Sequence, residues 1–376
     1  MRFLDTSTGM FLWINDPRHV RYAILSHTWG MAEQTYEDIK RLQAEAISAA
    51  KVESRSHTAP EDSISPPSIL AHPELSDKIA GACRAAREAG YELLWLDAAC
   101  INKSSSAELS EAINSMYLWY AVADVCLVYL SDVPDDDNVR AWNSCFRMSR
   151  WHTRGWTLQE LIAPRRVVFL SRKWRLLGSK MTLANLLQEI TRVDATILTG
   201  VTTLNSVSVY HRMSWASQRE TTRVEDKAYS LLGIFGVHMS PIYGEGSHAF
   251  IRLQEEIIRT IPDQSIFAWG PRQFLGARAG LASSDASAPF HEHERGLLAK
   301  SPEDFASTHD ATVMSPAELA YSVGRVIQLP PLQCAFTPEG VRVRLCCIDI
   351  RIPEDVAPDI GAGSRQEEKR GRIRAS

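Results

Sequence analysis

The stretch VCLVYLSD, residues 125–132, is the clearest strand in the sequence, and it sets the expected fold class. Its first part, Val125 to Leu130, is an unbroken apolar run, and the polar pair Ser131 and Asp132 follows it. A short apolar run without alternation is typical of a strand buried on both faces, as in a parallel sheet. The stretch therefore predicts a strand over Val125–Leu130, which Ser131 and Asp132 close.

Three further apolar runs are expected to pair with this strand, and helical patterns separate them. The runs are Tyr22–Ser26, Leu93–Leu96 and Val167–Leu170. Helices are predicted near Thr35–Ala50, around Ile79, Cys83 and Ala86, along Leu109, Ile113, Met116, Tyr117 and Tyr120, and over Gly155–Ile162. Ser105 and Glu108 form a capping-box signature before the third of these helices. This alternation predicts an α/β fold, with a mostly parallel sheet, helices on both faces and right-handed crossovers.

The polar residues that close these strands are the first candidates for a site. In open parallel sheets the ligand crevice lies beyond the carboxyl ends of the strands, near the point where the strand order reverses. The closing residues are Ser26 to Gly30, Asp97 to Lys103, and Ser131 with Asp132. Ser26 and His27 are neighbours on one strand, so their side chains should point to opposite sides and make a poor nucleophile–base pair.

The sequence also predicts how the chain is divided. An α/β domain is expected over residues 1–180, with a flexible insertion at about 51–74, where Ser, Pro, His and charged residues show no apolar period. A helical segment is expected to follow over 181–270. The remaining parts are a small-residue linker (271–295), a small β-containing region (296–360) and a disordered basic tail (361–376).

Composition and charge narrow the classes of function. Hydrophobic residues make up 45% of the chain and charged residues 23%, which is enough apolar material for a sizeable core. The net charge of -4 provides no basic footprint for nucleic acid. No apolar run approaches the roughly 18 to 20 residues of a membrane helix, and no signal peptide is recognised. The seven cysteines form no CxxC pair, so we expect a reduced, cytoplasmic protein without a membrane span.

The stretch RGWTLQELIAP, residues 154–164, contains a candidate catalytic carboxylate. Trp156 and Glu160 are four residues apart, so on a helix they share a face. An indole that excludes water from a carboxylate raises its pKa and suits it to acid, base or charge-stabilising work. The alternative is an ordinary carboxylate on an amphipathic helix, with Trp156 in the core. The chemistry of these residues alone favours the ordinary reading.

Two other motifs give weaker evidence for a functional site. His291-Glu292-His293 resembles a metal-binding pair, but it lies in the expected linker without a third ligand, so no metal is predicted. Gly244-Glu245-Gly246 lacks the Lys-Ser/Thr of a phosphate loop and follows no strand. A turn that opens a helix is the better interpretation of that motif.

Longer stretches of the sequence resemble a known family. YAILSHTWG (22–30), WLDAACINKSSSAELSEAINSMYLWY (95–120) and SRWHTRGWTLQELIAP (149–164) are similar to the three signature blocks of the fungal heterokaryon-incompatibility (HET) domain. Residues 213–237 and 241–258 resemble the segment that commonly follows it, so the likeness covers about residues 1–270. HET proteins are implicated in fungal self/non-self recognition, where activation triggers growth arrest and cell death. The resemblance therefore implies an incompatibility effector.

A more remote resemblance concerns the mechanism. HET domains have been argued to be distant relatives of the TIR domain, which implies a flavodoxin-like, TIR-like α/β fold. TIR enzymes that cleave NAD have a Trp-x-x-x-Glu helix whose Glu is catalytic, and Trp156 to Glu160 is similar to it. This likeness implies hydrolysis of NAD to nicotinamide and ADP-ribose, with Glu160 as the catalytic group. NAD is then the substrate, and no cofactor is implied.

The same resemblance implies a set of substrate-binding residues. Tyr22–Ser26 is similar to the first TIR strand, whose following loop borders the nucleotide, and an indole such as Trp29 or Trp156 could stack on a ring. The expected substrate-binding residues are Ser26, His27, Trp29, Gly30, Asp97 and Trp156.

Two other classes of function stay open. A non-enzymatic signalling module would act by self-association and by recruiting an incompatibility partner protein, as many TIR-type domains do. A silent truncated paralogue is the third alternative, suggested by the unusual C-terminal tail. The sequence does not choose among them.

Overall fold

The computed structural model describes residues 1–30, 32–56, 66–270, 297–306, 334–337 and 340–343. The chain forms two compact units, Met1–Val313 and Met314–Ser376. The first unit holds a seven-stranded sheet and the helices that surround it. The described part of the second unit is a two-stranded hairpin.

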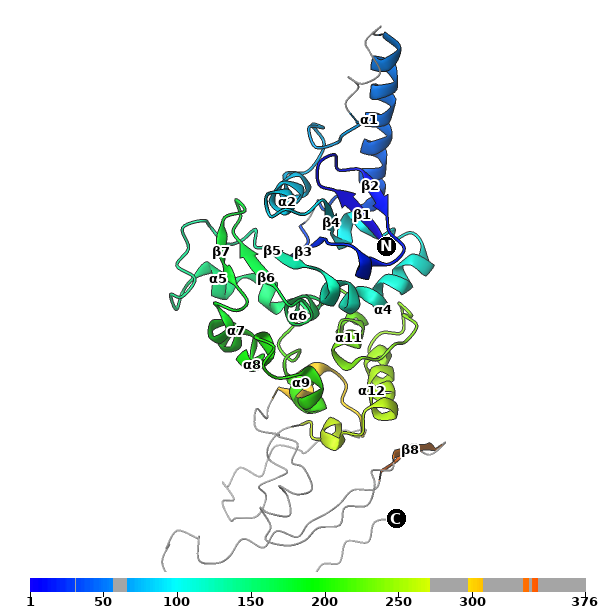
Figure 1. Ribbon diagram of the computed structural model, residues 1–376. Coiled ribbons are helices and arrows are strands. Elements are labelled where there is room, and N and C mark those ends of the chain that lie inside the picture. Colours follow the sequence, from blue (N-terminus) through cyan, green and yellow to red (C-terminus); the bar gives the residue numbers. More distant parts are fainter. Residues whose placement is uncertain (31, 57–65, 271–296, 307–333, 338–339, 344–376) are drawn as a thin grey trace, which may run out of the picture. The chain divides into compact units, whose positions relative to one another are not determined.

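A mixed sheet forms the centre of the first unit (Figure 1). Its strands are β1 (Arg2–Asp5), β2 (Phe11–Trp13), β3 (Ala23–His27), β4 (Leu93–Trp95), β5 (Val125–Tyr129), β6 (Val167–Leu170) and β7 (Leu176–Ser179). Their order in space is β2-β1-β4-β3-β5-β6-β7. The inner strands β4, β3, β5 and β6 run parallel, whereas the pairings at both edges are antiparallel.

The four parallel strands are those that the sequence predicted, at nearly the same bounds. β3 is buried over its whole length, and β5 is buried from Val125 to Val128. The strands have neighbours on both sides within the sheet and helices above and below it, so both faces need apolar side chains. This explains why the sequence shows continuous apolar runs here and no alternation.

The sheet is mixed rather than mostly parallel, because β1, β2 and β7 pair antiparallel at its edges. The sequence did not predict these three strands. These strands have only three or four residues each, too few for a clear periodic signal. β1 contributes the buried side chains of Phe3 and Leu4, but β2 exposes Leu12 and Trp13. Such short edge strands are specified by pairing with the rest of the sheet more than by their own sequence.

Helices cover both faces of the sheet. α1 (Tyr36–Ser56) and α2 (Asp77–Glu88) lie on one side, and α4 (Ser106–Val122) and α6 (Thr157–Ile162) lie on the other (Figure 1). The chain moves outward from β3 to β4 and then back across β3 to β5. Right-handed crossovers in opposite directions place their helices on opposite faces, as the alternation predicted.

The start of α4 contains half of the predicted capping box. The Ser105 hydroxyl accepts a hydrogen bond from the Glu108 N–H at 3.3 Å. The Glu108 carboxylate, however, accepts from the Asn102 N–H at 2.9 Å and from the Arg2 guanidinium at 2.7 Å. Glu108 therefore ties α4 to the N-terminal strand, a long-range role that a local motif does not predict.

The predicted insertion at 51–74 is shorter in the structure. α1 continues to Ser56, six residues past the expected end at Ala50. Residues 57–65 lie outside the described part of the chain. Beyond them Ile69 is fully buried and donates its backbone N–H to Thr8 O at 2.8 Å. The far end of the segment is thus packed against the N-terminal hairpin.

A series of short helices follows the sheet within the same unit. These are α7 (Ala184–Thr191), α8 (Ala195–Leu198), α9 (Val209–Ser214), α10 (Asp226–Tyr229), α11 (Leu232–Phe235) and α12 (His248–Thr260). α11 packs closely on α4, because a Cβ atom at Gly233 would lie 2.0 Å from the Cβ atom of Tyr117. The expected division after residue 180 therefore falls inside one compact unit.

The hairpin of the second unit consists of β8 (Cys334–Thr337) and β9 (Gly340–Val343), paired antiparallel. These strands lie within the expected β-containing region at 296–360. Most of that region and the expected linker and tail lie outside the described residues, as does His291-Glu292-His293. Among the described residues, no helix has both the length and the apolar character needed to cross a membrane.

Candidate functional site

A cavity of about 700 Å³ opens beyond the carboxyl ends of β3 and β4. This volume lies within the range of small-molecule sites, about 300–1,000 Å³. The polar side chains of its lining are His27, Thr28, Trp29, Asp97, Lys103, Arg150, Thr153, Arg154, Trp156, Glu160, Glu220, Thr221, Thr222, Arg223, Asp226 and Tyr243. The cavity thus lies at the edge of the sheet where the sequence predicted a site.

Ser26 and His27 end strand β3 and send their side chains to different partners. The Ser26 hydroxyl contacts Glu160 of α6, while the His27 ring contacts Asp97, the first residue of α3 (Asp97–Cys100). Successive side chains of a strand point to opposite faces, so this divergence follows from the strand itself. The prediction that the two would not act as a nucleophile–base pair agrees with this geometry.

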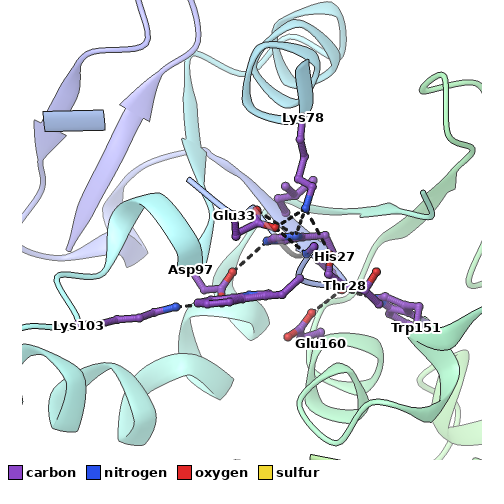
Figure 2. Close-up of polar contacts among 12 residues, drawn as sticks. His27, Thr28, Glu33, Lys78, Asp97, Lys103, Trp151 and Glu160 are labelled. Carbon is purple, nitrogen blue, oxygen red and sulfur yellow. Dashed lines mark hydrogen bonds and ion pairs between the residues drawn. The ribbon is translucent and has the colours of Figure 1, made fainter. Parts of the chain in front are cut away.

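Glu160 lies at the floor of the cavity and is only 6% exposed. The Ser26 Oγ donates to its Oε2 at 2.5 Å, and the buried indole of Trp151 donates to the same Oγ at 2.7 Å (Figure 2). Burial raises the pKa of Glu160 to about 7, although the hydrogen bond from Ser26 acts in the opposite direction. Near neutral pH this carboxyl group therefore exists in both protonation states.

The helix that carries Glu160 is held at both ends. Near its start, Arg219 Nη1 donates to Arg154 O at 2.8 Å and to Thr157 Oγ1 at 3.0 Å. At its end, the buried Lys180 ammonium donates to Leu161 O at 3.1 Å and also contacts Pro164 O. A cation at a helix C-terminus satisfies carbonyls that have no partner within the helix. These contacts keep α6, and with it Glu160, in one position.

The surroundings of Glu160 differ from those that the Trp-x-x-x-Glu spacing suggested. Trp156 lines the cavity, but its indole donates a hydrogen bond to Asp226, across from α6. Close to Glu160 lie two fully buried groups, Tyr120 of α4 and Cys126 of β5. Burial raises the pKa of both groups, and the charge of Glu160 raises them further. The sequence offered no way to foresee these two neighbours.

His27, Trp29 and Asp97 form a connected polar group in the lining of the cavity, and Figure 2 shows His27 beside Asp97. Asp97 accepts from His27 Nε2 at 3.1 Å and from Trp29 Nε1 at 2.9 Å. The ammonium of Lys103 lies 3.2 Å from the centroid of the Trp29 ring, a cation–π contact. Burial would raise the pKa of Asp97, but the hydrogen bond from His27 lowers it below the usual range. Asp97 is therefore an ionised anchor for this group.

The outer side of His27 is fixed by Lys78 of α2. The Lys78 ammonium lies 3.3 Å from His27 Nδ1 and also contacts the Glu33 carboxylate at 2.6 Å (Figure 2). An ammonium group can only donate, so Nδ1 must accept and the ring proton must lie on Nε2. This assigns the tautomer in which Nε2–H donates to Asp97.

Of the seven residues that the sequence proposed, the structure brings six together. His27, Trp29, Asp97, Trp156 and Glu160 line the cavity, and Ser26 supports Glu160 from below. Gly30 is not among the residues that line it, and its N–H donates to Glu33 Oε2 at 3.0 Å.

One wall of the cavity was missed entirely by the sequence reasoning. Residues 220–243 close it, through Glu220 to Arg223, Asp226 and Tyr243. This stretch is joined to the turn before α6 by two backbone hydrogen bonds, Gly155 N to Glu220 O and Glu220 N to Thr153 O. The sequence did show a dense run of charges here, but nothing in it indicated that the run faces α6.

The arrangement of these residues defines a class of site. A buried carboxyl group, whose pKa burial raises to about 7, faces an open, ligand-sized cavity with indoles and cations in its lining. Perturbed carboxyl groups in such cavities are typical of ligand-binding or catalytic centres. Among the described residues, no group of three or more His, Cys, Asp or Glu side chains could hold a metal ion.

Comparison with known proteins agrees with the sequence resemblance. Residues 22–143 match the family model described as heterokaryon incompatibility protein (HET), and residues 248–370 match that of a domain of unknown function (DUF8212). The vegetative incompatibility protein HET-E-1 of Podospora anserina is 42% identical over 243 residues, which is 63% of this chain and 16% of that protein. No solved structure matches the chain. The chain therefore carries a fungal HET domain, and the resemblance seen in its sequence is confirmed.

Proposed function

We propose that this chain is a cell-death effector of heterokaryon incompatibility that hydrolyses NAD to nicotinamide and ADP-ribose, with Glu160 as the catalytic carboxylate. The observation that carries the proposal is the position of Glu160 at the floor of a ligand-sized cavity, with its pKa raised to about 7 by burial. The likeness to an incompatibility protein supports the biological role.

The proposed reaction needs one well-placed carboxylate. The bond between ribose C1′ and the nicotinamide nitrogen breaks, and nicotinamide leaves as a neutral molecule with the bonding electron pair. Positive charge then develops on the ribose, and an ionised Glu160 stabilises it or binds the ribose hydroxyls. Water supplies the oxygen that bonds to C1′ and releases one proton. Because the leaving group is neutral, no strong general acid is required.

The strand order supports the TIR-like part of the proposal. Numbered along the chain, the four parallel strands lie in the order second, first, third, fourth. Flavodoxin-like sheets begin with this order, and they bind ligands where it reverses, beside the first and third strands. His27 and Trp29 follow the first of these strands and line the cavity. A nucleotide bound there would be within reach of Glu160.

The other predicted residues would position the substrate. Ser26 would hold the Glu160 carboxylate in one orientation, and Asp97 would fix the rings of His27 and Trp29. Lys103 covers one face of the Trp29 indole, so only its other face would be available for stacking on a ring of the ligand. Trp156 would couple α6 to the wall that contains Asp226.

The direct test measures nicotinamide release from NAD by the purified full-length chain, with and without a crowding agent that favours assembly. Glu160→Gln should lower the rate by roughly 10²-fold or more, because the stabilising charge is lost while the side-chain shape is kept. The matched control is Glu88→Gln, which changes an exposed carboxylate at the end of α2 and should leave the rate unchanged. Equal rates in wild type and Glu160→Gln would refute the catalytic role.

A specific surface feature favours the second candidate, a non-enzymatic module that acts by self-association. The side chains of Trp142, Met148 and Met181 are 88%, 77% and 62% exposed. Arg140 donates to Thr182 O at 3.1 Å and Arg147 lies over the Trp142 ring, so the loops that carry these side chains are adjacent. Exposed apolar clusters of this kind mark protein interaction surfaces. Folded, assembled protein that releases no nicotinamide, and that dissociates on Trp142→Ala, would support this candidate.

A further inference from the structure

We infer that Arg150 and Arg154 form a binding subsite in the cavity for the pyrophosphate group of a nucleotide. The inference extends the proposed function, since it names how the substrate would be held. Both residues belong to the turn that leads into α6: Arg150 begins η3 (Arg150–Thr153), and Arg154 follows that helix directly. Both side chains line the same cavity as Glu160.

The backbone of both arginines is fixed in place. Arg150 N–H donates to Asp132 Oδ2 at 2.9 Å, and Ser149 Oγ donates to the other oxygen of that carboxylate at 2.8 Å. On the far side, Arg154 O accepts from Arg219 Nη1 at 2.8 Å. A ligand bound by the two guanidinium groups would therefore meet a preformed turn.

The guanidinium groups of Arg150 and Arg154 differ from the other cations of the cavity in their contacts. Lys103 contacts the ring of Trp29, and Arg223 lies over the ring of Tyr243. Neither Arg150 nor Arg154 makes a side-chain hydrogen bond or ion pair with any residue in the described part of the chain. Their donors are thus available to a ligand.

Apart from Glu220, the acidic groups of the lining accept hydrogen bonds from neighbouring residues. Asp97 accepts from His27 and Trp29, Asp226 from Tyr243 and Trp156, and Glu160 from Ser26. Arg150 and Arg154 thus have no carboxylate partner in the described part of the chain, and an anionic group of a ligand would supply one. The charge of Arg154 acts on both Glu160 and Asp97, which shows that its guanidinium lies near the proposed reaction centre.

The chemistry of the donors indicates the class of ligand. A guanidinium presents a planar fork that binds two oxygens of one phosphate, and two such forks in one cavity suit the linked phosphates of a pyrophosphate. The cavity has room for more than an inorganic anion, and its free indole faces suit a base or another flat ring. A nucleotide with a pyrophosphate group satisfies both parts of the site.

The test measures binding of ADP, inorganic pyrophosphate and adenosine to the full-length chain by calorimetry. Arg150→Gln and Arg154→Gln should each weaken ADP binding by about tenfold, the effect of losing one charge-assisted contact. Adenosine, which has no phosphate, should bind to wild type no more tightly than ADP binds to the double variant. Arg165→Gln removes an exposed arginine outside the cavity and should change nothing.

The outcomes separate this inference from the proposed function. ADP binding that is absent in wild type, or unchanged in the double variant, overturns the subsite whether or not nicotinamide is released. ADP binding that depends on the two arginines, without nicotinamide release, supports the subsite and refutes the proposed reaction. Pyrophosphate that binds as tightly as ADP also supports the subsite, and assigns it to a free polyphosphate instead of a nucleotide.

Discussion

Ser26 and Glu160 are 134 positions apart in the chain, yet the Ser26 hydroxyl lies 2.5 Å from the Glu160 carboxylate. The serine ends the first parallel strand, and the glutamate lies on a short helix after the third. The same hydroxyl accepts a hydrogen bond from the buried Trp151 indole. One small side chain therefore connects the sheet, the turn before α6 and the candidate catalytic group.

Removing this hydroxyl should change the titration of Glu160. The hydrogen bond from Ser26 lowers the pKa of Glu160 relative to burial alone, so Ser26→Ala should raise that pKa above about 7. If the ionised carboxylate is the active form, the midpoint of the pH–rate profile for nicotinamide release should move to higher pH. The variant should also lose about 1–3 kcal/mol of stability, because the Trp151 N–H is left buried without an acceptor.

The control for this experiment is Ser48→Ala, which removes an exposed serine hydroxyl on α1. It should alter neither the midpoint nor the stability. A lower rate for Ser26→Ala with an unchanged midpoint would contradict the role given to the hydroxyl.

The buried carboxyl group should make stability depend on pH in a defined direction. The pKa of Glu160 is raised by burial from 4.5 to about 7, so the folded state holds its proton over a range in which the unfolded chain releases it. Stability from this group is therefore lost as pH rises from about 4.5 to about 7. Glu160→Gln lacks the ionisable group and should gain stability relative to wild type over that window, by about 3 kcal/mol in all.

Urea unfolding of wild type and Glu160→Gln at a series of pH values measures this effect. The difference in the free energy of unfolding between the two proteins cancels the contributions of other titrating groups. A difference that stays constant between pH 5 and pH 8 would mean that Glu160 titrates normally in the folded chain.

The contact between α6 and residues 220–243 leads to a packing prediction. A Cβ atom at Gly155 would lie 2.5 Å from Thr221 Cγ2, so Gly155→Ala should destabilise the chain by about 1–3 kcal/mol. Thr221→Ser removes the clashing methyl group but keeps the hydroxyl that donates to Arg223 O. The double variant should therefore recover most of the loss in thermal unfolding. If Thr221→Ser does not restore the stability lost in Gly155→Ala, the strain lies at another contact.

The role of Trp156 can be separated from that of the core around Glu160. Tyr120 and Cys126 lie near Glu160, whereas the Trp156 indole bonds to Asp226. Trp156→Phe should therefore leave the pKa of Glu160 near 7 while the pKa of Asp226 rises further, because a hydrogen bond that lowers it is lost. Trp156→Ala tests the bulk of the ring. A fall of the Glu160 midpoint toward 4.5 in that variant alone would restore the interpretation that the indole excludes water.

The parts of the fold that the sequence predicted are those with a strong local signal. β5 and β6 are continuous apolar runs, β3 begins with one, and Ile79, Cys83 and Ala86 of α2 are spaced for one helical face. β1 and β2 carry too few residues for such a signal, and they form because β4 offers an edge to pair with. Local patterns identify an element more readily than they identify its partners.

The site follows the same rule. Asp97, His27 and Trp29 could be predicted because they close buried strands, and such positions meet at one edge of a sheet. Arg150, Arg154 and Asp226 could not, because their place in the cavity depends on how distant segments pack. Glu160 was suggested by its spacing from Trp156, but the neighbours near it, Ser26 and Cys126, come from strands far away in the chain.

The contribution of residues 150–243 to the cavity has a consequence for how such genes recombine. The family match ends at residue 143, before Arg150, Arg154 and Glu160, and the wall at 220–243 lies farther on. A crossover at residue 143 would combine His27, Trp29 and Asp97 of one parent with the lining residues after position 143 of another. The cavity is thus built from a stretch that runs from His27 to Tyr243, and a chimaera joined within it should line its cavity with side chains from two parents.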